Sequence, residues 1–245
     1  MEIAASKILT IEEFNVISDI FSHAITGELI GMSNFASLAD TINDPHEKME
    51  AVEHANSERM HAEGFLDYAN KTKLKININL ESTYWGNVRK QFLSYAFKKD
   101  FIACLIIQEV ILESFAISMY QDVSEALGGE AGRLFMNIGN EEKEHLAHSS
   151  DILRAELEIN PEAFINKFEE VHFNCMTILA EFTAQTDLKG HCGVCNGSCM
   201  KGSLHHVGLD VKNMRGNALA LYAQALDNIG IPGEKSIVWI TRLPA

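Results

Sequence analysis

The sequence predicts an all-α protein built as a bundle of long amphipathic helices, and three observations support this prediction. Apolar residues recur with a helical period of three to four along most of the chain. Start signals at residues 44–45 and 160–161 (Asp-Pro and Asn-Pro) and a stop signal at 128–129 (Gly-Gly) divide the chain into helix-length segments. Residues 76–80 (ININL) alternate like a strand but are short and have no partner, so we expect a connection there.

The first helix begins with a capping signal. Thr10 and Glu13 have the spacing of a capping box, which opens the first helix. We expect six helices in all, over about residues 11–42, 45–68, 88–127, 131–157, 161–188 and 211–229. The last ends at Gly230, and Pro232 prevents its continuation. Residues 190–208 are rich in Gly, Cys and His and have no apolar period, so we expect a single domain over residues 1–245 with an inserted loop at 190–208.

Composition excludes several classes of function. The net charge is −14 and no Lys/Arg cluster occurs, which argues against a nucleic-acid or anionic-membrane partner. The stretch Phe101 to Tyr120 is long enough to cross a membrane, but Glu109 and Glu113 lie inside it, which favours a buried core helix over a membrane span. The five cysteines and the absence of a signal-like N-terminus predict reduced thiols or metal ligands in a cytoplasmic protein.

The strongest chemical signal is a repeated pattern of glutamate and histidine. The sequence contains three Glu-x-x-His pairs: Glu58/His61, Glu142/His145 and Glu169/His172. Glu28 precedes Glu58 by 30 residues and Glu113 precedes Glu142 by 29, roughly the length of one helix up, a turn and one helix down. The third pair has no glutamate at a matching distance, and we interpret it as a chance occurrence.

This spacing predicts a metal site inside a ferritin-like four-helix bundle with additional helices. Residues three apart share one helical face, and the 52 residues from His61 to Glu113 leave room for a long crossover. A buried carboxylate such as Glu113 needs compensation, which a cation would supply. Carboxylate and imidazole ligands suit iron or manganese. The candidate catalytic and metal-binding residues are Glu28, Glu58, His61, Glu113, Glu142 and His145; alternatively, these are scattered surface residues.

Nearby glutamates complicate this assignment. Glu109 lies one turn before Glu113 and could be a further ligand of the same site. Glu144 could replace a ligand by one helical step. The other neighbouring acids, Glu53, Glu63 and Glu141, are expected in solvent or just outside the ligands.

The six positions, with TGE around Glu28, IIQEVILESFAIS around Glu113 and LYAQALDNIGI near the C-terminus, resemble the alkane-forming aldehyde-deformylating oxygenases. The resemblance runs from about residue 14 to 231. It implies that the glutamate of each pair, Glu58 and Glu142, bridges two iron ions. It also implies that the remaining ligands complete one iron each, as Glu28 with His61 and Glu113 with His145.

The resemblance implies an enzyme that reduces O2 with electrons from an external donor, for which we expect an electron-transfer protein. A small or medium apolar organic substrate would need an apolar pocket to exclude water. The aromatic residues that could line such a pocket are Phe35, Phe65, Phe115 and Tyr120.

The cysteine-rich loop departs from the family pattern. Cys192, Cys195 and Cys199 are closely spaced, and His191 flanks them. Soft ligands in a Gly-rich loop predict a second metal site holding zinc or an iron–sulfur cluster, with a histidine or Cys175 as fourth ligand. Free thiols or a redox-active pair are the alternatives.

This loop leaves the reaction open between aldehyde deformylation and N-oxygenation of an amine or hydrazine nitrogen. Two other functions remain as alternatives: a ferritin-like iron-binding or ferroxidase protein without an organic substrate, and a helical binding protein that uses the loop for interaction. A homodimer is also left open.

Overall fold

The computed structural model describes residues 9–183, 194–195 and 199–244, and it contains helices and connections but no strand within these ranges. In chain order the helices are α1 (Ile11–Leu38), α2 (Pro45–Thr72), α3 (Thr83–Ala96), α4 (Phe101–Leu105), η1 (Ile106–Leu112), α5 (Glu113–Leu127), α6 (Gly129–Ile159), α7 (Pro161–Thr183), η2 (Met200–Gly202), η3 (Leu204–Val207), α8 (Val211–Ile229) and α9 (Gly233–Thr241). The all-α prediction is confirmed.

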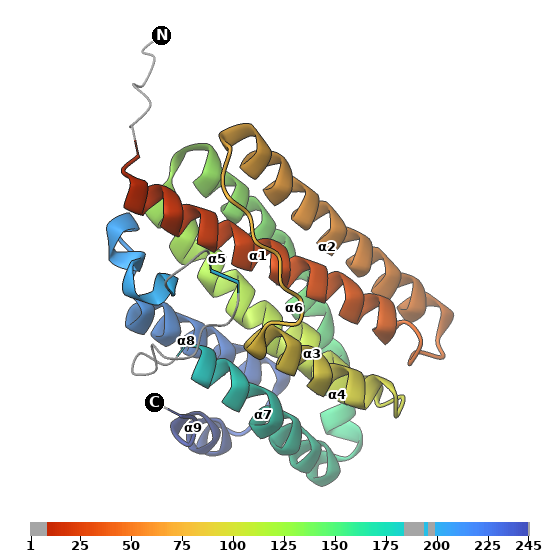
Figure 1. Cartoon of the computed structure of the whole chain (residues 1–245). Coiled ribbons are helices and arrows are strands. Elements are labelled where there is room, and N and C mark those ends of the chain that lie inside the picture. The colour runs from red at the N-terminus through yellow and green to blue at the C-terminus, as the bar shows by residue number, and fades with distance from the viewer. Residues whose placement is uncertain (1–8, 184–193, 196–198, 245) are drawn as a thin grey trace.

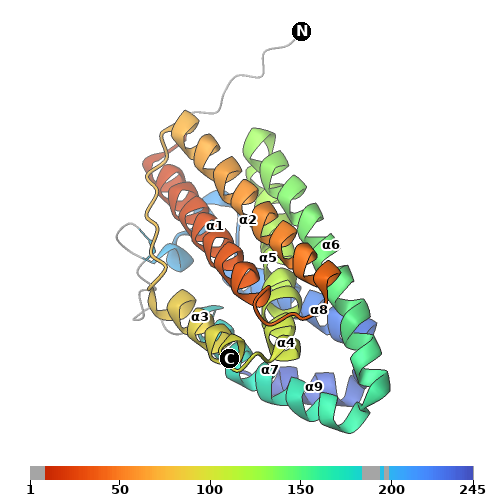
Figure 2. The same ribbon diagram turned by 90° about the vertical axis from the view of Figure 1, so that its right-hand side faces the viewer.

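Helices α1, α2, α5 and α6 lie side by side as a four-helix bundle, made of the hairpins α1–α2 and α5–α6 (Figures 1 and 2). The chain crosses between the hairpins through residues 73–82 and α3. Helices α7, α8 and α9 gather at one side of the bundle (Figure 1). Phe21, Phe65 and Phe135 are fully buried and pack against one another, which fixes one half of the bundle core.

The helix start signals act as expected. The Thr10 hydroxyl accepts from the Glu13 backbone N–H at 3.1 Å, and the Glu13 carboxylate accepts from the Thr10 N–H at 2.8 Å, which completes the capping box. The Asp44 carboxylate accepts from the backbone N–H groups of residues 46 and 47 at the start of α2.

The predicted helix over 88–127 is wrong in its bounds and its continuity. It begins at Thr83 and breaks after Ala96, because Lys99 adopts a left-handed backbone (φ 56°) that an α-helix cannot continue through. Asp100 then caps a new helix by accepting from the Ala103 N–H. The next turns, η1, form a π-helix, a wider helix often found at functional sites.

Two other connections test the predicted element ends. Residues 76–80 form a connection, as expected, and the preceding Lys75 N–H donates to the Ser18 hydroxyl on α1 at 3.1 Å. At the C-terminus the six-helix prediction is incomplete, because Pro232 caps a further helix, α9, rather than ending the helical region. Trp239 on α9 is 1% exposed, so burial of this large side chain holds the added helix in place.

The apolar stretch Phe101–Leu127 is the one described helical segment long and apolar enough to cross a membrane. In its most apolar window 78% of the residues are buried inside the protein. Glu109 and Glu113 are each only 2% exposed within it. Most of this segment is therefore buried inside the protein, as expected for a core helix.

Part of the predicted loop at 190–208 lies outside the described residues. Its later part forms the short helices η2 and η3. Leu204 on η3 is buried against the α1 side of the bundle core. That the chain is one domain with an inserted loop stays a prediction.

Candidate metal centre

The fold brings all six predicted ligands together in the middle of the four-helix bundle. In the first hairpin, α1 supplies Glu28 and α2 supplies the pair Glu58 and His61. In the second hairpin, α5 supplies Glu113 and α6 supplies the pair Glu142 and His145. All six are buried, with exposed fractions of 1–5%. Their ligand atoms form two groups, each gathered within 4.8 Å: Glu28, Glu58, His61 and Glu142, and Glu58, Glu113, Glu142 and His145. The groups share Glu58 and Glu142, which is the arrangement of two adjacent metal positions with common carboxylates.

The two histidines both turn their Nδ1 atoms toward the carboxylates. His61 Nδ1 lies 2.9 Å from Glu142 Oε1 and 3.2 Å from Glu28 Oε2. His145 Nδ1 lies 2.9 Å from Glu142 Oε2. On the outer side of the ring, His61 Nε2 lies 2.9 Å from the carboxylate of Glu141. A metal-binding histidine usually has such a partner on its other nitrogen, because that contact orients the ring.

The carboxylates resist being charged together without a cation. Burial, with the nearby Glu142 and Glu28 carboxylates, raises the pKa of Glu58 and that of Glu113 well above the usual value. Burial alone would also raise the pKa of Glu142. The imidazoles of His145 and His61 outweigh it and lower that pKa to about 2.

A proton on His61 therefore compensates charge in the metal-free protein. Burial opposes the protonation of His61, but its contacts with Glu142 and Glu28 raise its pKa to about 11. Glu142 Oε2 and His145 Nδ1 are buried without a hydrogen bond of normal geometry although they lie 2.9 Å apart. Metal ions would satisfy both atoms, so the residues present fit a pair of metal ions.

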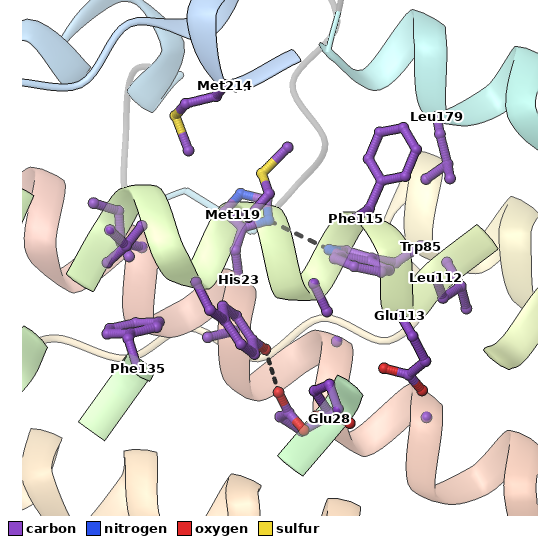
Figure 3. Close-up of a pocket in the computed structure, with 18 of the residues that line it drawn as sticks. His23, Glu28, Trp85, Leu112, Glu113, Phe115, Met119, Phe135, Leu179 and Met214 are labelled. Atoms are coloured by element: carbon purple, nitrogen blue, oxygen red, sulfur yellow. Dashed lines mark hydrogen bonds between the residues drawn. The ribbon is translucent and has the colours of Figure 1, made fainter. Parts of the chain in front are cut away.

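Polar neighbours position the candidate ligands. Asn34 donates to the Gln108 side-chain oxygen at 2.9 Å, and Gln108 donates to Glu113 Oε1 at 3.2 Å, so a hydrogen-bonded chain orients Glu113. The Tyr120 hydroxyl donates to the Glu28 carboxylate, and this hydrogen bond is the dashed line that ends at Glu28 in Figure 3. Burial and the nearby Glu28 raise the Tyr120 pKa well above its usual value, which keeps this hydroxyl a donor.

A mostly apolar pocket opens beside the carboxylates. Figure 3 shows Glu28 and Glu113 on one side of it and Met214 on the other. Its lining includes Leu112, Phe115, Ala116, Met119, Tyr120, Phe135, Leu179 and Met214. Phe115 and Tyr120 line it as predicted. Phe35 and Phe65 are buried in the bundle but are not among the residues that line it.

The other glutamate and histidine candidates from the sequence lie outside the two groups of the metal centre. Glu109 is not in either group of the metal centre, since its carboxylate faces His54 and His148 instead. Glu144 is exposed. His172 of the third pair is buried in the core with its Nδ1 2.9 Å from the Tyr222 hydroxyl, which fits its interpretation as a chance occurrence.

The cysteine loop is described only in part. Cys192 and His191 lie outside the described residues, while Cys195 Sγ lies 3.5 Å from His23 Nε2 and Cys199 lines the same small cavity. Cys175 packs in the main hydrophobic core, away from the cluster that contains Cys195. No group of three potential ligands forms around Cys195 among the residues that are described.

Several contributing residues were not found from the sequence. Gln108, Asn34 and Gly31 carry no motif, and only the fold brings them beside the ligands. A Cβ on Gly31 would stand 2.8 Å from the Glu58 carboxylate, so this glycine makes room for that group. His54 was also missed, although it precedes Glu58 by four residues and so shares its helical face. This spacing could have indicated from the sequence that His54 lies near the candidate ligands.

Fold and site together define a helical bundle whose paired carboxylate and imidazole groups can hold two metal ions, the class to which di-iron carboxylate proteins belong. A family model described as long-chain fatty aldehyde decarbonylase matches residues 13–182, and the chain belongs to this family. The family consists of di-iron enzymes of the oxygenase type, so the protein is an oxidoreductase. The resemblance found in the sequence is confirmed.

A solved structure shows the same fold. The protein described as "Protein 19 with aldehyde deformylating oxidase activity from Synechococcus" aligns with a TM-score of 0.78. The alignment covers 95% of this chain and 98% of that one at 18% sequence identity. At this identity the match supports the ferritin-like architecture, which agrees with the helix order described above.

Proposed function

We propose that the protein is an O2-dependent di-iron oxygenase that removes the formyl group from an apolar aldehyde. One observation carries the proposal: a mostly apolar pocket ends on four buried glutamates that belong to two adjacent metal-binding groups. Membership of the aldehyde decarbonylase family supports the same reaction.

The ligand roles follow from which residues the two groups share. Glu58 and Glu142 belong to both groups and would bridge the ions. Each remaining glutamate and histidine would complete one ion, Glu28 with His61 and Glu113 with His145. Iron bound there would supply the reduction of O2, with electrons from an external electron-transfer protein.

The protein's own residues select and hold the substrate. Leu112, Phe115 and Met119 give the pocket an apolar wall that excludes water from the reacting end. Beyond the four glutamates, the ionisable side chains among the described lining residues are those of His23 and Tyr120. His23 Nδ1 already accepts from the Trp85 indole at 3.3 Å (Figure 3).

Such a lining favours an uncharged substrate. Among the described lining residues the carboxylates all lie at the metal-binding end, so a protonated amine would have to lose its water along the apolar wall before it reached them, which is costly. An aliphatic aldehyde has no such penalty, and its carbonyl end can reach the carboxylate end of the pocket. N-oxygenation of an amine or hydrazine is therefore the rival reaction and aldehyde deformylation the preferred one.

The test is anaerobic loading with Fe2+ followed by O2, a reductant and a series of straight-chain aldehydes. We expect an alkane one carbon shorter than the aldehyde, with formate in equal amount, measured by gas chromatography and enzymatic formate assay. Glu113→Ala should abolish both products and lower bound iron, whereas Glu144→Gln, an exposed acid on the same helix as Glu142, should change neither. Oxidation of amines or hydrazines but not of aldehydes would favour the rival reaction.

A ferroxidase without organic substrate makes a different prediction. It would consume O2 with Fe2+ alone, assemble into a large shell and show no response to aldehydes. Oxygen uptake that rises with aldehyde chain length, and a small assembly by light scattering, would exclude that function.

We also propose that the cysteine loop forms a second metal site, which binds zinc or an iron–sulfur cluster. Its candidate ligands are Cys192, Cys195, Cys199 and His191. Cys195 Sγ lies 3.5 Å from His23 Nε2, so a thiol and an imidazole, both of which can bind zinc, lie close together on this side of the pocket. Elemental analysis should find zinc, or iron with sulfide, that disappears in Cys195→Ser. Equal metal content in that variant would contradict the second site.

A further inference from the structure

A third cluster of potential ligands lies one helical turn away from the metal centre. His54 precedes Glu58 by four residues on α2, and Glu109 on η1 precedes Glu113, the first residue of α5, by four. His148 follows His145 by three on α6. Because α2 and α6 are antiparallel neighbours, all three steps lead in the same direction along the bundle (Figure 2). The fold therefore repeats the ligand-bearing layer once more.

We propose that His54, Glu109 and His148 form a third, mononuclear site for a divalent first-row transition ion. One ligand atom from each of the three lies within 4.8 Å of the others. Two imidazoles and one carboxylate are the ligand set of many mononuclear iron and zinc sites, which keep open positions for water or a small ligand.

The distances are those of ligands around a common ion rather than of hydrogen bonds. His54 Nδ1 and His148 Nδ1 each lie 3.7 Å from an oxygen of Glu109. A direct N–H···O bond would be about 2.7–3.2 Å long. Two ligand atoms held about 2.1 Å from one ion at a tetrahedral angle lie about 3.4 Å apart, so a small adjustment would close the site on a metal.

The polar atoms that face this space have no other partner. His54 Nδ1, His148 Nδ1 and Glu109 Oε2 are all buried without a hydrogen bond. Glu109 is 2% exposed and His54 is 9% exposed, so water cannot readily replace the missing partners. An unsatisfied buried carboxylate oxygen costs free energy that a bound cation would remove.

An outer contact orients the imidazole of His148, and ring packing positions that of His54. His148 Nε2, the ring nitrogen that faces away from Glu109, lies 3.4 Å from the Glu47 carboxylate. Metal-binding histidines commonly use this nitrogen to contact a carboxylate. The His54 ring lies against that of His145, with centroids 4.1 Å apart, which places the third site directly beside the metal centre.

The alternative is a simple ion pair between a protonated His148 and Glu109. Burial opposes the charge on Glu109, but the two histidines outweigh it and keep its pKa below the usual value. This charge state suits a metal ion as well as an ion pair, so the number of bound ions has to decide.

The experiment counts metal ions per chain after anaerobic loading with Fe2+ alone and, in parallel, Zn2+ alone. Counted apart from any ion in the cysteine loop, which Cys195→Ser removes, we expect three ions in the wild type and in the control Glu144→Gln, and two in Glu109→Gln and His54→Leu. Affinity for the third ion should fall at least 100-fold in both variants. Circular dichroism should show unchanged helicity, and anomalous diffraction from loaded crystals should place the third ion between the three side chains.

Two ions in the wild type, or three in Glu109→Gln, would overturn the third site. The count is independent of the reaction. If the third site fails, two ions remain with aldehyde turnover intact, whereas failure of the proposed reaction would leave three bound ions without product.

Discussion

Gly31→Ala tests whether the space beside Gly31 is needed by the carboxylate of Glu58, a candidate bridging ligand. Gly31 lies within α1, and an added Cβ would stand 2.8 Å from both Cδ and Oε2 of Glu58. Normal van der Waals contact begins near 3.4 Å, so the carboxylate must move by at least about half an ångström. Metal–ligand distances tolerate only about 0.2 Å, so the site would lose this ligand's geometry.

The effects on stability and on metal binding should be opposite. Alanine in a helix interior is about 0.5–1 kcal/mol more favourable than glycine. The Glu58 carboxylate is the end of a flexible side chain, so the metal-free variant should keep part of that gain. Iron affinity should instead fall by about 10–100-fold, the usual cost of disturbing ligand positions.

Gly216→Ala is the matched control, because no atom lies within 4 Å of a Cβ at Gly216 on α8. It should gain helix stability without any change in iron affinity. Urea unfolding of the metal-free proteins measures the first quantity, and anaerobic Fe2+ titration measures the second. Wild-type iron affinity in Gly31→Ala would refute the placement of Glu58 as a ligand in this position.

Three further predictions concern the core, the ligand supports and the pocket. Burial lowers the pKa of His172 from 6.5 to about 4. Below pH 6.5 the unfolded chain therefore binds a proton at this group that the folded protein does not, which favours unfolding. From this group alone the wild type should lose about 2 kcal/mol of unfolding free energy between pH 7 and pH 5, and His172→Gln should lose about that much less in urea unfolding at the two pH values; equal losses would contradict the assignment. Gln108→Leu leaves Glu113 without its amide donor and should cost about 1–3 kcal/mol in the metal-free protein and weaken iron binding, measured by the same two assays; unchanged values would show that Gln108 does not position Glu113. Ala116→Phe fills the pocket and should shift turnover toward shorter aldehydes while iron content stays constant; an unchanged chain-length profile would place the substrate elsewhere.

The helical class, the main helix starts and the six candidate ligands could all be predicted from the sequence. These are local properties, because a capping box or an Asp-Pro start acts within one turn, and Glu-x-x-His places both side chains on one face. The similar sequence separations of Glu28 from Glu58 and of Glu113 from Glu142 also predicted contacts between helices. They did so because each residue of a helix adds the same rise, so equal lengths of two antiparallel helices bring the two glutamates to the same height in the bundle.

The surroundings of those ligands depend on how the helices pack and could not be predicted from the sequence. The break at Lys99 and the π-helical turns before Glu113 depend on how this segment packs, which apolar periodicity does not record. The same packing turns Glu109 away from the metal centre and toward His54 and His148, although it stands one turn from Glu113. Spacing along one helix gives the face of a side chain, but contacts between helices decide which partners that face meets.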